Sequence, residues 1–112
     1  MLFRSIYPAK IEALASRHEA IDKVVALPAP DERLGEKVCL AVTFRAGQTV
    51  EAEAMLDHLS AAGLSKFDMP EYFLKLGAMP LTPSGKILKR ELVAAVAEGR
   101  LRPTPVRFQG KG

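Results

Sequence analysis

The chain has 112 residues, of which 48% are hydrophobic and 26% are charged, with a net charge of +3 and a single cysteine. This length fits one domain with little room for a deep active site, so we do not expect the chain to catalyse a reaction alone. One cysteine excludes an internal disulfide, and the sequence shows neither a signal peptide nor the ~18–20 apolar residues of a membrane span. We therefore expect a cytoplasmic protein.

Helical and β-branched segments follow one another in the first part of the chain. Residues 8–16 predict a helix, because their apolar positions fall on one face. Residues 21–27 are rich in valine and isoleucine and predict a strand that ends at Pro28. A turn at residues 30–35 then leads into a second strand over residues 37–44.

The second part of the chain predicts two further helices and one more strand. Thr49 is a candidate N-cap for a helix over residues 50–62, which Gly63 ends. Residues 71–76 predict a third strand, and residues 88–97 predict the last helix. This order indicates an α+β fold: a single domain with a small, mainly antiparallel sheet covered by helices.

Cysteine and histidine are common in active sites, but we expect structural roles for the one cysteine and the two histidines of this chain. Cys39 lies in an apolar run without a basic neighbour, so we expect a buried, inert thiol. His18 and His58 are far apart in the sequence and lack metal-ligand spacing around them. We expect both to be surface residues of helices, and we expect no metal site.

Positive charge is concentrated near the C-terminus. From Gly85 to the end there are seven lysines or arginines against two glutamates, whereas the preceding residues hold nine basic and eleven acidic side chains. Such a patch suits a phosphate-bearing partner. It also suits a solvated helix face followed by a basic, irregular tail over residues 99–112.

The most informative segment is residues 80–92, which read PLTPSGKILKREL. Its prolines, serine and glycine predict a loop between a strand and a helix, and Gly85 gives the backbone freedom just before Lys86. A lysine ammonium can bridge two oxygens that gain negative charge. A phosphate loop of the Walker type is excluded, because it needs glycine and a hydroxyl residue where this chain has Pro80 and Ile87.

Three segments together resemble the adenylate-forming superfamily, which contains acyl-CoA synthetases, peptide-synthetase adenylation domains and luciferases. Residues 80–92 closely resemble its last lysine-bearing motif. Two upstream segments agree in order and spacing: residues 6–12, which read IYPAKIE, and residues 29–36, which read APDERLGE. The resemblance covers about residues 6–95 and points to the C-terminal domain of an AMP-forming acyl-CoA synthetase.

The resemblance implies a domain organisation and a reaction. Residues 6–98 would be a lid that closes over an N-terminal adenylation domain, and residues 1–5 would be the remnant of a hinge. The full-length enzyme would be an acid–thiol ligase with ATP and CoA as substrates, forming acyl-AMP and then acyl-CoA. Mg²⁺ would come with ATP on the N-terminal domain.

The resemblance also implies roles for named residues. Lys86 matches the lysine that reaches the carboxylate and the α-phosphate during adenylation, on a loop that Thr82, Ser84 and Gly85 shape. An acetyltransferase and a deacetylase acting at Lys86 would switch that charge off and on.

Contacts to CoA or nucleotide are implied less directly. Phe67 matches an aromatic that stacks near the adenine of CoA in some relatives, and Lys66 would supply a phosphate contact because Met69 stands where a basic residue is usual. Lys89 and Arg90 would attract ATP or CoA, unless they are solvated helix residues.

The alternative function is a stand-alone binding or regulatory module with a basic surface and no catalysis. We expect no nucleic-acid partner, because aromatic residues do not interleave with the basic cluster. The acid substrate is not encoded in this segment; the tail loosely resembles ligases for medium-chain, alicyclic or aromatic acids.

Overall fold

Residues 8–31, 35–65 and 68–106 are described by the computed structural model, and they form three helices and four strands. In chain order these are α1 (Pro8–Ala15), β1 (Ile21–Asp31), β2 (Gly35–Phe44), α2 (Ala52–Ala61), β3 (Tyr72–Lys75), α3 (Lys89–Ala97) and β4 (Thr104–Pro105). The predicted α+β class is confirmed, and the predicted elements all form with shifted ends.

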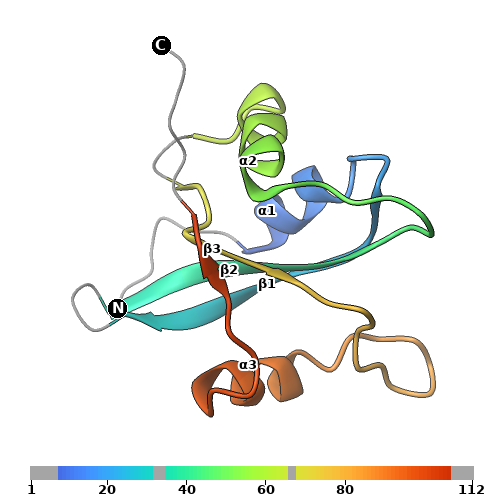
Figure 1. The fold of residues 1–112 in the computed structure, drawn as a ribbon, viewed down its shortest axis with the longest axis vertical. Coiled ribbons are helices and arrows are strands. Elements are labelled where there is room, and N and C mark those ends of the chain that lie inside the picture. Colours follow the sequence, from blue (N-terminus) through green and yellow to red (C-terminus); the bar gives the residue numbers. More distant parts are fainter. Residues whose placement is uncertain (1–7, 32–34, 66–67, 107–112) are drawn as a thin grey trace.

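The four strands make one sheet in the order β1-β2-β3-β4 (Figure 1). The β1–β2 and β3–β4 pairs are antiparallel, whereas β2 and β3 run parallel. The parallel pair arises because the connection from β2 to β3 contains α2, and parallel neighbours need such a long crossover. The sheet is therefore mainly antiparallel, as predicted, but mixed.

The interior strand β2 buries both of its faces. Leu40 and Val42 belong to a core cluster with residues of α1 and α2, which we call the α1/α2-side cluster. Cys39 and Ala41 belong to a second cluster with Leu92 of α3, which we call the α3-side cluster. Because strand side chains alternate between faces, one strand can carry two cores. Figure 1 shows α1 and α2 on one side of the sheet and α3 on the other.

The predicted end of the first strand at Pro28 is wrong, because β1 continues to Asp31. Strand β1 lies at the sheet edge, so every second backbone nitrogen points away from β2. The Ala26 N–H is one of these, since it donates to Glu12 Oε2 of α1 at 2.8 Å. Pro28 follows two residues later, on the same outward side, where its missing N–H costs no ladder bond. An edge strand thus tolerates a proline that, from the sequence, predicts the end of the strand.

The predicted N-cap of α2 is also wrong. Its N-cap is Glu51, with no side-chain capping bond, and Thr49 lies outside the helix. Val50 is buried in the α1/α2-side cluster. Glu51 is extended, with ψ of 157°, so the helix begins after it. The predicted end at Gly63 is confirmed by its φ of +107°, a conformation that favours glycine.

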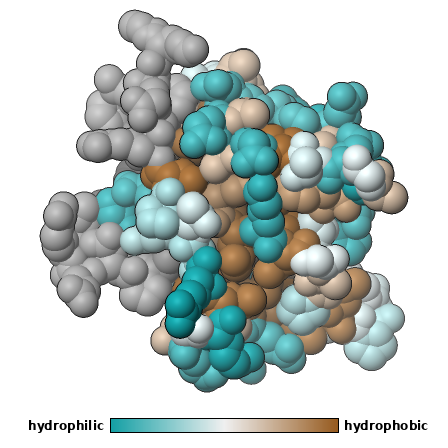
Figure 2. Space-filling view, viewed as in Figure 1, coloured by the Kyte–Doolittle hydropathy of each residue, from teal (hydrophilic) through white to brown (hydrophobic). Residues whose placement is uncertain are grey.

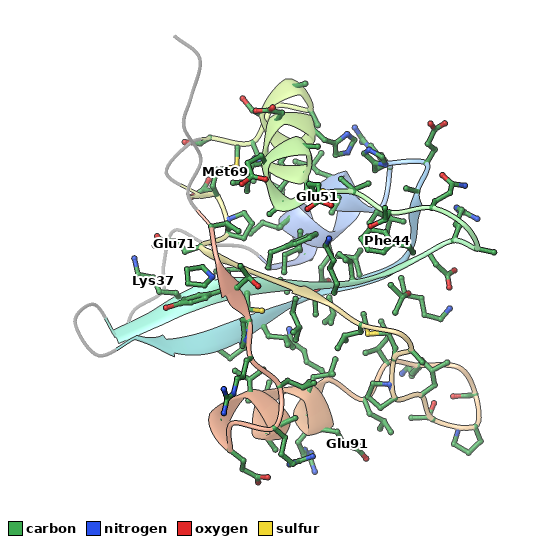
Figure 3. All side chains as sticks on the ribbon, in the orientation of Figure 1. Lys37, Phe44, Glu51, Met69, Glu71 and Glu91 are labelled. Atoms are coloured by element: carbon green, nitrogen blue, oxygen red, sulfur yellow. The ribbon has the colours of Figure 1, made fainter. Side chains whose placement is uncertain are left out.

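The tail predicted to be irregular contains β4, which pairs with β3. The Val106 N–H donates to the Glu71 carbonyl at 2.9 Å, and Val106 packs against the α1/α2-side cluster. Glu71 also forms an ion pair with Lys37 of β2 at 2.6 Å, at one end of the sheet (Figure 3). The segment is therefore anchored through Val106; residues 107–112 lie outside the described residues.

The surface reflects this layering. Figure 2 shows hydrophobic residues in the middle of the visible face, with hydrophilic residues concentrated toward its upper and lower margins. Within the described residues, no helix combines the length and apolar character needed to cross a membrane.

Candidate functional site: a lysine hairpin

The lysine singled out in the sequence lies on a hydrogen-bonded hairpin. The Thr82 N–H donates to the Lys86 carbonyl at 2.8 Å, and the Gly85 N–H donates to the Thr82 carbonyl at 2.9 Å. Residues 83–85 are thus a three-residue hairpin loop between Thr82 and Lys86. Such loops end in a left-handed residue that forms a bulge, and Gly85 has φ of +92°.

The base of the hairpin is attached to the domain core. Leu81 and Ile87 pair as an antiparallel bridge, and the Leu88 N–H donates to the Pro80 carbonyl at 2.8 Å. Met79 is buried in the α3-side cluster, and Ile87 packs against that cluster. The loop is therefore a short projection with a fixed base next to α3.

The side chain of Lys86 is directed away from this core. Neighbouring residues of a β-ladder point to opposite sides, and Ile87 packs against the α3-side cluster. Lys86 is exposed accordingly. Among the described residues, its ammonium has no hydrogen-bond or ion-pair partner, so it is available to an anion from outside the chain.

The start of α3 adds to the positive potential near the hairpin. Lys89 is the first residue of α3 and is half-buried, and Arg90 beside it is exposed. The positive end of the helix dipole lies there too. Glu91 offsets part of this charge from the first turn of α3 (Figure 3). The three cations follow one another along one short segment, and their roles toward ATP or CoA remain predictions.

The predicted CoA contacts are only partly described. Phe67 and Lys66 lie outside the described residues. Met69 is buried in the α1/α2-side cluster, and Pro70 is fully buried. Position 69 therefore serves the core and offers no contact to a phosphate.

Cys39 is buried, as predicted. Its residue has 0% exposure, and burial raises the pKa of its thiol to about 12. A thiol that stays protonated at neutral pH is a poor nucleophile, so Cys39 packs and does not react.

His58 lies in α2, as predicted, but the expectation that both histidines are surface residues of helices is otherwise wrong. His18 lies in the turn after α1, and the two half-buried rings meet edge to face with centroids 5.1 Å apart. A ring nitrogen of His58 lies 2.8 Å from the Leu14 carbonyl, and the Ala20 N–H donates to His18 Nδ1. The pair ties α1 to α2, a contact that sequence spacing could not reveal. Within the described ranges, no three metal-ligating side chains gather into a site.

A shallow hollow of about 390 Å³ lies beside α2 and β3, between them and the C-terminal segment. Lys75 Nζ lies 3.4 Å from Glu51 Oε2 at its rim, and Arg102 also lines it. The lining carries both signs of charge. Sequence patterns do not reveal this hollow, because its walls come from segments that only the fold brings together.

Comparison with known proteins agrees with this geometry. The family model for the AMP-binding enzyme C-terminal domain matches residues 10–86, ending on the hairpin lysine. The medium-chain acyl-CoA ligase ACSF2 of Mus musculus is 33% identical over 79% of this chain and 14% of its own length. The 2-hydroxy-7-methoxy-5-methyl-1-naphthoate–CoA ligase of Streptomyces carzinostaticus is 34% identical over 85% of this chain and 17% of its own. The chain thus spans about a sixth of these relatives.

A solved structure leads to the same family. The fatty acyl CoA synthetase of Mycobacterium tuberculosis superimposes with a TM-score of 0.73 and 26% identity, over 83% of this chain and 18% of that one. The family match covers most of the sheet, most of α1, all of α2 and the whole lysine hairpin loop. The chain therefore belongs to the AMP-binding enzyme C-terminal domain family of adenylate-forming enzymes.

Proposed function

We propose that this chain is the C-terminal lid of an ATP-dependent acyl-CoA synthetase and that Lys86 assists formation of the acyl-adenylate. The observation that carries the proposal is the exposed ammonium of Lys86, which has no partner among the described residues, on a hairpin whose base packs against the α3-side cluster. A group that must reach reactants on another domain needs this combination of exposure and fixed placement.

The chemical role of Lys86 is electrostatic. In the first half-reaction a carboxylate oxygen bonds to the α-phosphorus of ATP, and the bond to the leaving pyrophosphate breaks. Two anions must approach each other, and charge builds on the oxygens around phosphorus. An ammonium between the carboxylate and the α-phosphate offsets this repulsion while keeping its own protons.

The second half-reaction would use the same lid in another orientation. The CoA thiol sulfur bonds to the acyl carbon, AMP leaves with the bonding electrons, and the thiol proton passes to solvent. Lys86 has no charge to offset between phosphate and carboxylate in this step. We therefore assign it to adenylation alone.

The remaining parts of the enzyme would lie on the N-terminal adenylation domain. ATP, the acid pocket and Mg²⁺ belong there in this proposal, since the described residues of this chain hold no cluster of carboxylates for a metal ion. The acid would be a medium-chain, alicyclic or aromatic one. Two relatives support this range, because their names specify a medium-chain acyl group and a naphthoate.

Modification of Lys86 would regulate the enzyme. Its side chain is exposed and has no partner in the described part of the chain, so an acetyltransferase can reach it. Acetylation removes the charge that the adenylation step uses, and a deacetylase would restore it.

Replacing Lys86 tests the assignment. In the full-length enzyme, Lys86→Ala should lower the rate of adenylate formation by about 10²–10³-fold. The rate is measured as the release of pyrophosphate. Transfer of the acyl group from preformed acyl-AMP to CoA should be largely retained. Lys10→Ala, an exposed lysine of α1, is the matched control and should behave as the unmodified enzyme. Equal loss of both half-reactions on replacing Lys86 would refute the role.

A further inference from the structure

The Lys86 backbone N–H has an unusual hydrogen-bond partner. In a regular two-residue hairpin, the carbonyl of the residue opposite would accept this N–H. Here the Thr82 carbonyl accepts the Gly85 N–H instead, because the loop has three residues. The Lys86 N–H donates to the Thr82 side-chain oxygen Oγ1 at 3.0 Å.

Thr82 therefore forms hydrogen bonds with both backbone polar groups of Lys86, its N–H and its carbonyl. The Thr82 N–H donates to the Lys86 carbonyl at 2.8 Å, while the Thr82 hydroxyl oxygen accepts the Lys86 N–H. A lysine has four rotatable side-chain bonds, and no described residue forms a hydrogen bond or an ion pair with the Lys86 ammonium, so fixing the backbone of Lys86 restrains where the side chain starts before reactants bind.

The residues next to Thr82 and its own branched side chain favour the orientation in which its hydroxyl accepts this N–H. Pro83 follows Thr82, and the residue before a proline is pushed toward extended backbone conformations. Threonine is β-branched, which restricts its χ1 rotamers. Ser84 Oγ lies 3.0 Å from Thr82 Oγ1 and is a second hydrogen-bonding neighbour of the same oxygen, beside the Lys86 N–H. The hydroxyl thus has little freedom to leave the Lys86 N–H.

We propose that the Thr82 hydroxyl is a positioning residue for adenylation, which places the Lys86 backbone so that its ammonium reaches the reacting carboxylate and α-phosphate. This inference rests on the proposed function and adds a residue-level requirement to it. Placement errors of about 1 Å can cost up to 10²-fold in rate, so a missing hydroxyl should be visible in kinetics.

The test compares two substitutions in the full-length enzyme. Thr82→Val keeps the branched shape and removes the hydroxyl; Thr82→Ser keeps the hydroxyl. We expect Thr82→Val to lower kcat for adenylate formation by about tenfold, equivalent to about 1.4 kcal/mol, with little change in KM for ATP. Thr82→Ser should recover most of this loss, and transfer from preformed acyl-AMP should be unaffected in both.

Controls separate positioning from general damage. Thr49→Val removes a hydroxyl from an exposed threonine in the turn before α2 and should leave both half-reactions unchanged. Ser84→Ala removes a hydroxyl that contacts Thr82 and not the Lys86 N–H, so its effect should be smaller than that of Thr82→Val. Hydrogen exchange at the Lys86 amide should be faster in Thr82→Val than in Thr82→Ser, a readout independent of activity.

The outcomes distinguish the two proposals. If Lys86→Ala abolishes adenylation while Thr82→Val adenylates normally, the positioning role is wrong and the proposed function stands. Equal losses of both half-reactions in Thr82→Val would also overturn the positioning role. If Lys86→Ala adenylates normally, the proposed function itself fails.

Discussion

The β1–β2 ladder and the lysine hairpin are both antiparallel pairs, yet different forces hold them. In the ladder, Leu40 and Cys39 have 0% exposure and face two separate core clusters. In the hairpin, Leu81 is 39% exposed and Lys86 faces solvent, so backbone bonds and one hydroxyl define the loop. Apolar burial therefore stabilises the fold, while local hydrogen bonds shape the reactive loop. Substitutions in the ladder should change unfolding, and substitutions in the hairpin should change adenylation.

The largest effect on folding is expected from Leu40→Ala. Leu40 is fully buried in the interior strand β2, so its truncation should lower the free energy of unfolding by about 2–5 kcal/mol. Urea denaturation followed by circular dichroism measures this change. Leu81→Ala, in the hairpin, is the matched control and should cost far less. Similar losses from the two leucines would break the comparison.

A smaller loss of stability is expected from replacing either of two glycines with left-handed φ, and only one of the two replacements should also lower activity. Gly85 has φ of +92° and Gly47, in the turn between β2 and α2, has φ of +75°. An added Cβ meets nothing within 4 Å at either position, so backbone strain of about 1–3 kcal/mol is the whole cost of Gly→Ala.

The two alanine variants should differ in activity and not in stability. Gly85→Ala should slow adenylate formation by about 10- to 100-fold, because relief of that strain shifts the Lys86 backbone and a misplacement of about 1 Å can cost up to 10²-fold in rate. Gly47→Ala should adenylate normally in the full-length enzyme. Pyrophosphate release gives the rates, and thermal unfolding gives the stabilities. A Gly47→Ala enzyme as slow as Gly85→Ala would show that the hairpin has no special role.

The smallest effect at neutral pH concerns Cys39. Burial raises the pKa of its thiol from 9.0 to about 12, so the folded chain keeps a proton that the unfolded chain loses above about pH 9. The free energy of unfolding should therefore fall as pH rises from about 9 toward 12 and be unaffected by this group below pH 9. Denaturation at several pH values checks this, with Cys39→Ala as the control. In Cys39→Ala the free energy of unfolding should fall less between about pH 9 and 12 than in the unmodified protein. An equal fall in both proteins would exclude Cys39 as the cause.

Much of the fold followed from local patterns. The segments around Ile11, Val42 and Leu92 show helical or alternating apolar positions, and these residues are all buried. Gly63 and Gly85 mark a helix end and a hairpin loop because left-handed φ values favour glycine. Local signals fail where the position of a strand in the sheet, or a contact with a distant segment, decides whether residues form a strand. Examples are Pro28 within β1 and the short strand β4.

The sequence by itself determined the three helices, the three longer strands, the buried thiol and the lysine loop, because each depends on residues close together in the chain. The tertiary structure alone decided the parallel β2–β3 pair, the contact of His18 with His58 and the hollow near Lys75. Which distant residues contact each other depends on how the helices and the sheet pack together, and the spacing of residues along the chain says little about that packing.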